Sequence, residues 1–187
     1  MDWRSLLNAR PVVVAIAGSN EAGKSTFFHA NLAGTALRFI NADDLAAEMR
    51  LGAYEASALA AALRASLVEQ RESFVFETVL SDPVGAKVRE LEEWSRSGLA
   101  VIVIFIRIDS PDTSKQRVAM RVLQGGHDVP DENLESRFHR TLANLQRAVQ
   151  ALPVVVIFDN TDLSRPYRLE AIYCRGQRVG RSPASNW

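Results

Sequence analysis

The feature that most constrains this chain is an apolar run that leads directly into glycine, lysine and hydroxyl residues, "VVVAIAGSNEAGKSTFF" (12–28). The stretch contains the full pattern G-x-x-x-x-G-K-[ST], from Gly18 to Ser25. Glycine lets backbone N–H groups converge on phosphate oxygens, and the helix expected to follow turns its positive end toward them. We therefore predict a phosphate-binding loop between a buried strand and a helix. The alternative is a glycine-rich turn with a solvated lysine.

The phosphate-binding interpretation gives individual loop residues a role. Lys24 is expected to reach the β and γ phosphates of ATP, and the Ser25 hydroxyl is expected to help hold Mg²⁺. Glu21 is unusual in this loop, because a carboxylate near a triphosphate is repulsive unless its side chain points outward. The predicted nucleotide-binding residues of the loop are Gly18, Ser19, Asn20, Glu21, Ala22, Gly23, Lys24, Ser25 and Thr26.

Apolar, β-branched runs alternate with segments that have helical spacing. The five runs span 12–17, 36–41, 73–77, 99–108 and 153–158. Their nearly continuous apolar character is typical of strands covered on both faces. Apolar residues three or four positions apart, among them Leu59, Leu63 and Leu67, predict helices around 59–67 and 134–149. The fold expected is three-layer α/β, with a mostly parallel five-stranded sheet, helices on both faces, and a hairpin or edge strand at 167–179.

Length and charge limit the classes of protein that remain. With 187 residues and 47% hydrophobic content, the chain is expected to form a single domain over 1–187. Its 22 Lys and Arg balance 22 Asp and Glu, so no overall field draws it to nucleic acid or to an anionic membrane. The lone Cys174 and the lack of a secretion signal indicate a reducing, cytoplasmic setting. The longest apolar run, 99–106, is too short for a membrane-spanning helix.

Carboxylates follow two of the predicted strands. Asp43 and Asp44 come after the second strand, and Glu77 ends the third. Ligands of open α/β sheets bind at the carboxyl ends of strands, so these acids are expected near the phosphate-binding loop. There a carboxylate can accept a proton from an attacking hydroxyl or hold a water bound to Mg²⁺. Helix capping is the alternative for Asp43, and a solvated strand end is the alternative for Glu77.

Two pairs of arginines flank a glycine-containing break. Arg117 and Arg121 lie one helical turn apart, "GGHDVP" (125–130) interrupts the helix, and Arg137 and Arg140 follow one turn apart. This organisation predicts a mobile lid over about 117–140 whose arginines neutralise phosphate charge. The alternative is that the arginines are solvated partners of nearby acids. Asn160, in "FDNTD" after the fifth strand, is expected beside the adenine unless it only forms a turn.

Taken together, the stretches "AGSNEAGKST", "FINADDLA", "FETVLS", "RVLQGGHDVPDENLESRFHRTLANL" and "IFDNT" resemble, in this order, the zeta-toxin family of P-loop kinases. The resemblance covers roughly 11–162 and implies a P-loop kinase-like fold. It implies transfer of the γ phosphate of ATP to a hydroxyl of a nucleotide sugar such as UDP-N-acetylglucosamine, and an antitoxin protein as a partner.

The resemblance also implies roles for particular residues. Asp43 resembles the base that accepts the hydroxyl proton, Lys24 the phosphate lysine, and Arg121 and Arg137 the catalytic lid arginines. The substrate-binding positions implied are Asn41, Asp44, Glu77, Thr78 and His127. The chain departs from the family pattern at Glu21, where glycine is usual, and it is shorter than the larger zeta toxins.

Other functions stay open on the sequence alone. The same core suits a kinase of another small molecule, such as a nucleoside, a sugar acid or an antibiotic. A nucleotide-binding ATPase or switch that acts through a protein partner is an alternative of a different class. A transporter-type signature and a guanine-selective N-K-x-D string are both absent from the sequence.

Overall fold

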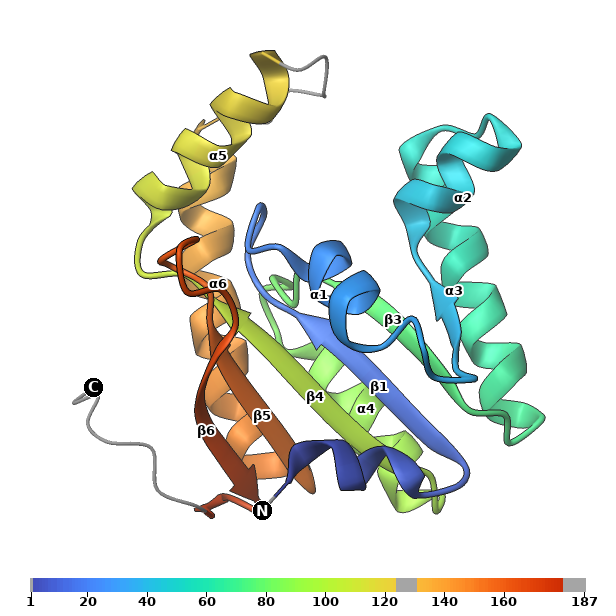
Figure 1. Cartoon of the computed structure of the whole chain (residues 1–187). Helices are drawn as coiled ribbons and strands as arrows, with labels where there is room; N and C mark the ends of the chain where they lie inside the picture. Colours follow the sequence, from blue (N-terminus) through green and yellow to red (C-terminus); the bar gives the residue numbers. More distant parts are fainter. Residues whose placement is uncertain (1, 124–130, 180–187) are drawn as a thin grey trace.

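The computed structural model describes residues 2–123 and 131–179, and it contains one seven-stranded sheet with helices on both faces (Figure 1). The first five strands coincide with the five apolar runs of the sequence, because β-branched side chains favour the extended backbone. The strands are β1 (Val12–Ala17), β2 (Arg38–Ile40), β3 (Phe74–Thr78), β4 (Ala100–Arg107), β5 (Val154–Asp159), β6 (Arg168–Cys174) and β7 (Gln177–Arg178).

The helices connect these strands and cover the sheet. They are η1 (Trp3–Asn8, a 3-10 helix), α1 (Lys24–Asn31), α2 (Ala42–Met49), α3 (Ala53–Glu69), α4 (Ala86–Arg96), α5 (Pro111–Leu123) and α6 (Asp131–Ala151). The three-layer α/β architecture predicted from the sequence is confirmed.

The strands lie in the order β2-β3-β1-β4-β5-β6-β7. The strands that follow β1 in the chain are added on one side of it up to β3, and on its other side from β4 onward. Strands β1 to β5 are parallel, with β3 on one side of β1 and β4 on the other. The register pairs Ile16 of β1 with Glu77 of β3, and Ile40 of β2 with Phe76. The carboxyl ends of β1, β2 and β3 therefore meet at one edge, where ligands of such sheets bind.

The C-terminal part of the chain adds two strands to the predicted five. Strand β6 runs antiparallel to β5, and β7 folds back on β6 through a turn in which Arg175 and Gly176 have positive φ angles of 49° and 78°. The sheet thus has seven strands instead of five. The hairpin expected at 167–179 is confirmed.

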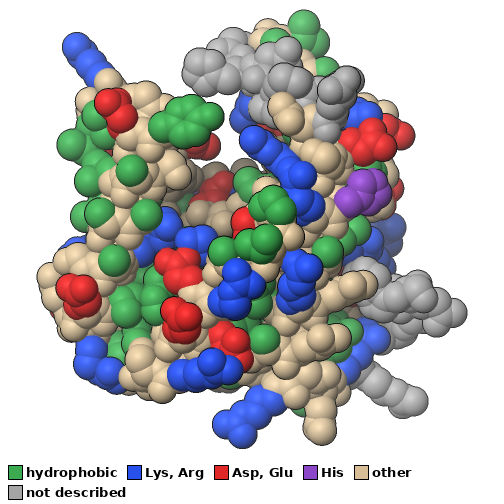
Figure 2. Space-filling model, turned by 180° about the vertical axis from the view of Figure 1, so that it is seen from behind, with side chains coloured by type: hydrophobic (Ala, Val, Ile, Leu, Met, Phe, Trp, Pro, Cys, Tyr) green, Lys and Arg blue, Asp and Glu red, His purple; other side chains and the backbone are tan. Residues whose placement is uncertain are grey.

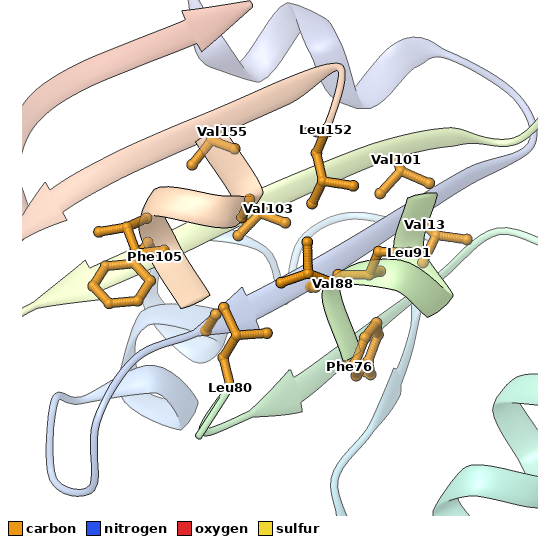
Figure 3. Packing of buried hydrophobic residues seen from close by; sticks show 14 of the residues in the cluster. Val13, Phe76, Leu80, Val88, Leu91, Val101, Val103, Phe105, Leu152 and Val155 are labelled. Carbon is orange, nitrogen blue, oxygen red and sulfur yellow. The ribbon is translucent and has the colours of Figure 1, made fainter. Parts of the chain in front are cut away.

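Two hydrophobic clusters, one on each face, hold the layers together. On one face, α3, α4 and α6 pack against the sheet, and Figure 3 shows Val88 and Leu91 of α4 beside Val13, Phe76 and Val103. On the other face, η1 and α1 cover the sheet, with the rings of Phe27 and Phe158 5.0 Å apart. All six residues of β1 are fully buried, as expected of a central strand.

Helix α3 differs from the expectation in the face that it buries. The leucine spacing predicted its position correctly, but Leu63 is 38% exposed. The buried residues are Ala56, Ala60, Arg64 and Leu67, which recur every three or four positions. Small alanines let the helix lie close to the sheet edge, and an arginine occupies a position where an apolar residue is normal.

Candidate active site

The phosphate-binding loop, residues 18–25, begins where β1 ends and runs directly into α1. Gly18 passes so close to β4 that a Cβ there would lie 2.5 Å from the carbonyl oxygen of Ile106. Gly23 has a φ of 91°, and a Cβ there would lie 2.7 Å from Asn160 Nδ2. Both positions are therefore closely packed, and Gly23 also has a backbone conformation that other residues rarely adopt, as expected of glycines in a phosphate-binding loop.

Side chains from α5 brace this loop from one side. Arg117 donates through Nη1 to the carbonyl of Glu21 (3.1 Å), and through Nη2 to the carbonyls of Asn160 (2.8 Å) and Thr161 (3.1 Å). The buried Ser114 donates to the carbonyl of Asn20 (2.9 Å). Arg117 is thus committed to backbone carbonyls in this structure, and it fixes the loop relative to the segment after β5.

The segment that follows β5 braces the loop from the other side. Asn160, fully enclosed, donates from Nδ2 to the carbonyl of Ala22 (2.8 Å), and the Tyr167 hydroxyl donates to the carbonyl of Gly23 (2.9 Å). Burial raises the pKa of the Tyr167 phenol, which keeps its donor proton in place. Contact of Asn160 with a nucleotide base stays a prediction.

Lys24 is buried at the start of α1. Its ammonium donates to the carbonyl of Ser19 (2.8 Å) and lies 3.7 Å from Glu77 Oε1. Burial lowers the pKa of Lys24, and the neighbouring carboxylates of Glu77, Glu21 and Asp43 act in the opposite direction. The three acids thus favour the charged form, which is the form that binds phosphate.

Glu77 connects three elements of the site. Its Oε2 accepts hydrogen bonds from Ser25 Oγ (2.7 Å) on α1 and from Asn41 Nδ2 (3.2 Å) after β2, and its Oε1 faces Lys24. The residue is half-buried at the end of β3. A solvated strand end, the alternative for Glu77, does not describe this arrangement.

Asn41, and not Asp43, caps α2. Its Oδ1 accepts a hydrogen bond from the Asp43 backbone N–H (2.8 Å), so the Asp43 side chain is left available in the first helical turn. Asp44 also lies in this turn and is exposed, close to the positive end of the helix. The capping alternative for Asp43 is therefore wrong.

A cavity of about 310 Å³ opens beside these residues. It is lined by Asn41, Ala42, Asp43, Ser57, Ala60, Arg64, Phe76, Glu77, Thr78, Val79 and Lys87. The surface of the molecule is visibly hollowed between the part that carries α2 and α3 and the part that carries α5 (Figure 2). Four of the five predicted substrate-binding residues lie at this end of the molecule, and Asn41, Glu77 and Thr78 line the cavity itself.

Glu21 forms an ion pair that the sequence did not indicate. Its Oε1 lies 2.8 Å from Arg121 Nη1 of α5, and the two side chains are 22% and 40% exposed. Glu21 has a φ of 57°, in the left-handed region that glycine adopts without strain, which agrees with glycine being usual at this position. The carboxylate is thus neutralised by an arginine that was predicted to bind phosphate.

The second pair of arginines lies on α6. Arg137 is half-buried near the start of the helix, and Arg140 donates from Nε to the carbonyl of Ser81 (2.9 Å). Arg140 therefore joins α6 to the loop after β3. The helix break and His127 lie outside the described residues, and so does the central part of the predicted lid.

Several residues that shape the site were not singled out by sequence reasoning. They are Arg64, Lys87, Ser114 and Tyr167. For Arg64 the signal was present, because it occupies a buried-face position of the α3 period. The contacts of Ser114 and Tyr167 join residues distant in sequence, so local patterns hold no trace of them.

The oxygen ligands at the loop suit a hard divalent cation. The Ser25 hydroxyl and the Glu77 carboxylate are adjacent, and Mg²⁺ binds through one or two such oxygens together with phosphate oxygens and water. Within the described residues, no cluster of three or more His, Cys, Asp or Glu forms a metal site by itself. The donor set therefore fits a cation that arrives with a nucleotide.

A comparison with models of protein families shows the family of the chain. The zeta toxin family model matches residues 40–171, which is more than half of the chain. The chain belongs to the zeta toxin family. The matched region begins at the end of β2 and includes Asp43, Glu77, α5 and α6. The family assignment is therefore independent of the phosphate-binding loop. The resemblance drawn from the sequence is confirmed, whereas the search of curated proteins finds no match.

Solved structures show the same fold. A chain of the crystal structure of AvrRxo1-ORF1:-ORF2 with ATP matches with a TM-score of 0.69 and 17% identity, over 94% of this chain and 63% of that one. The present chain thus spans less than two thirds of that relative. A putative kinase from Chloroflexus aurantiacus matches with a TM-score of 0.58 and 19% identity, over 84% and 92% of the two chains.

The structure of the PezAT chromosomal toxin-antitoxin system of Streptococcus pneumoniae also matches, with a TM-score of 0.58 and 15% identity, over 83% of this chain and 72% of that one. The likeness shows that the chain has a P-loop kinase-like fold. Among its described helices, none has both the length and the apolar character that crossing a bilayer requires.

Proposed function

We propose that this zeta toxin is a phosphotransferase that moves the γ-phosphoryl group of ATP to a hydroxyl group of a small molecule. The observation that carries the proposal is the meeting of Lys24, Ser25, Glu77 and Asp43 at the ends of three neighbouring strands, next to a cavity. Lys24 and the loop are suited to the nucleotide, and the cavity is suited to the acceptor.

The transfer assigns one task to each group. Asp43 accepts the proton of the acceptor hydroxyl while that oxygen forms a bond to the γ-phosphorus. The bond from this phosphorus to the β,γ-bridging oxygen breaks, and ADP leaves. Lys24 neutralises charge on the β and γ phosphates, and Ser25 and Glu77 would hold Mg²⁺. When bound, Mg²⁺ would supply further neutralisation of phosphate charge.

Arginines of α5 and α6 complete the charge balance in this proposal. Arg121 lies near the loop and Arg137 lies on α6, so both are candidates to contact the transferred phosphoryl group. In the structure Arg121 pairs with Glu21, and in this proposal it exchanges the carboxylate for phosphate oxygens of ATP.

The acceptor we favour is a nucleotide sugar such as UDP-N-acetylglucosamine, on the family resemblance. A protein partner, an antitoxin, is proposed on the same ground and on two matched structures, one of AvrRxo1-ORF1 with ORF2 and one of a toxin-antitoxin system. A cytoplasmic location is part of the proposal.

The assignment of Asp43 can be tested by replacing it with asparagine. The protein is incubated with labelled ATP, Mg²⁺ and a panel of nucleotide sugars, sugars and nucleosides, and products that gain one phosphoryl group are identified by mass spectrometry. We expect Asp43→Asn to bind ATP normally and to lose about 10² to 10⁴ in transfer rate. Glu48→Gln, an exposed change on the same helix, is the matched control.

Two results would count against the proposal. Full transfer activity of Asp43→Asn would show that Asp43 is not the general base. Hydrolysis of ATP that no acceptor of the panel accelerates would favour an ATPase or switch that acts through a protein partner.

A further inference from the structure

The wall of the cavity formed by α3 carries a buried arginine. Arg64 is only 9% exposed, and its guanidinium carbon lies 4.9 Å from the centre of the Phe76 ring. Its Nε has no hydrogen-bond acceptor among the described residues. A buried N–H group without an acceptor is costly, so an arginine is rarely kept at a position that only needs to be filled.

The guanidinium of Arg64 lies over the face of the Phe76 ring. This contact is a cation-π interaction, which does not use the N–H groups of the guanidinium. The donors of Arg64 can therefore bind the paired oxygens of a carboxylate or phosphate group.

A second cation lines the same cavity. Lys87, at the start of α4, forms an ion pair with Glu90. Glu90 also raises the pKa of Arg64, against the lowering effect of burial. Glu90 therefore interacts with both cations of this part of the cavity.

The charges that line the cavity are of both signs. Asp43 and Glu77 come from the ends of β2 and β3, whereas Arg64 and Lys87 come from α3 and α4. The acids accompany the nucleotide loop, because Glu77 contacts Lys24 and Ser25. A cavity for a neutral acceptor would have no need for the buried cation.

We propose that Arg64, assisted by Lys87, binds an oxyanion of the acceptor, either a phosphoryl or a carboxylate group. The inference rests on the proposed transfer function and assigns the residues that would position the acceptor. Arg64 positions the acceptor, and the hydroxyl that reacts is presented to Asp43 from the same cavity.

The experiment observes the Nε–H group of Arg64 directly. The ¹⁵N-labelled protein is saturated with Mg²⁺ and a non-hydrolysable ATP analogue, which fills the phosphate-binding loop, and is then titrated with inorganic phosphate or with acetate. The Arg64 signal is assigned by its loss in Arg64→Lys. We expect a saturable downfield shift with phosphate if the group is phosphoryl and with acetate if it is a carboxylate.

Variants separate binding from packing. Arg64→Met keeps an apolar side chain over Phe76 and is expected to bind the effective anion about 10- to 100-fold more weakly, the loss typical of a hydrogen bond to a charged group. Arg64→Lys should retain part of the binding. Arg96→Gln is the matched control, because Arg96 is 72% exposed on α4 in a surface ion pair, and it should bind as the unmodified protein does.

The outcomes that overturn the proposal are specific. They are the absence of any shift with either anion in the unmodified protein, and equal anion affinity of Arg64→Met. Asp43→Asn distinguishes the two proposals, because it should bind the anion normally while it fails to transfer phosphoryl groups. If transfer itself is disproved, the anion titration still decides the role of Arg64.

Discussion

Replacing Glu77 by glutamine probes the electrostatic centre of the candidate site. Glutamine has nearly the same size and can still accept a hydrogen bond from Ser25, but it cannot balance the charge of Lys24. Lys24 is 6% exposed and Glu77 is 17% exposed, so water screens their attraction incompletely. The change therefore removes one charge and little else.

The size of the effect follows from the separation of the two groups. At 3.7 Å and an effective dielectric constant of about 20, the Coulomb attraction amounts to about 4 kcal/mol. Glu21 and Asp43 remain and also favour the charged lysine, so we expect about half of this value, about 2 kcal/mol, to be lost from the free energy of unfolding. For a chain of this length such a loss lowers Tm by about 4–8 °C.

The pH dependence of stability gives an independent check. Burial lowers the pKa of Lys24 below its usual value of 10.5, and Glu77 acts against this effect. Between the lowered pKa of the folded protein and 10.5, the unfolded chain binds more protons, so the contribution of Lys24 makes stability rise with pH. In Glu77→Gln the pKa of Lys24 falls further, and this rise should begin at a lower pH.

Thermal unfolding at a series of pH values measures both effects. Glu92→Gln is the control, because Glu92 forms a surface pair with the 72% exposed Arg96 and its loss should cost less than about 1 kcal/mol. The same Tm and the same pH profile in Glu77→Gln and in the unmodified protein would refute the electrostatic account of the site.

Two further predictions concern the loop. Glu21→Gly places glycine at a position with a left-handed backbone, which glycine adopts freely, and it removes the carboxylate that pairs with Arg121. We expect the free energy of unfolding to change by less than about 1 kcal/mol and ATP to bind more tightly in a calorimetric titration. Weaker ATP binding would show that Glu21 assists the nucleotide. Arg117→Met removes three hydrogen bonds that a charged side chain donates to the loop and to the segment after β5. It should lower the free energy of unfolding by about 2–4 kcal/mol and raise KM for ATP. An unchanged denaturation midpoint would show that α5 does not brace the loop.

The sequence was most informative where structure depends on neighbours along the chain. The phosphate-binding loop, the five parallel strands and the helices around 59–67 and 134–149 follow from local periodicity and from a motif with a mechanism. The acids Asp43 and Glu77 were placed correctly at strand ends because parallel strands share one edge.

Features that depend on tertiary packing were not predictable in this way. Nothing near Arg117 in the sequence identifies the carbonyls of Glu21, Asn160 and Thr161 as its partners. The burial of Arg64 depends on the rotation of α3 about its axis, which the leucines at 59 and 63 obscured. The capping of α2 by Asn41 was readable in principle, because Asn directly precedes the helix.

The two margins of the sheet are its shortest strands, since β2 has three residues and β7 has two. Unpaired backbone groups at a sheet margin are a template on which another chain can add a strand, and the template grows with strand length. Among the described residues, β1, β3, β4 and β5 are interior strands, whereas β7 pairs only with Tyr173 and Cys174 of the seven-residue β6. Addition of a strand at β2 or β7 would thus gain few backbone hydrogen bonds, and the longest open stretch of sheet margin is the first part of β6.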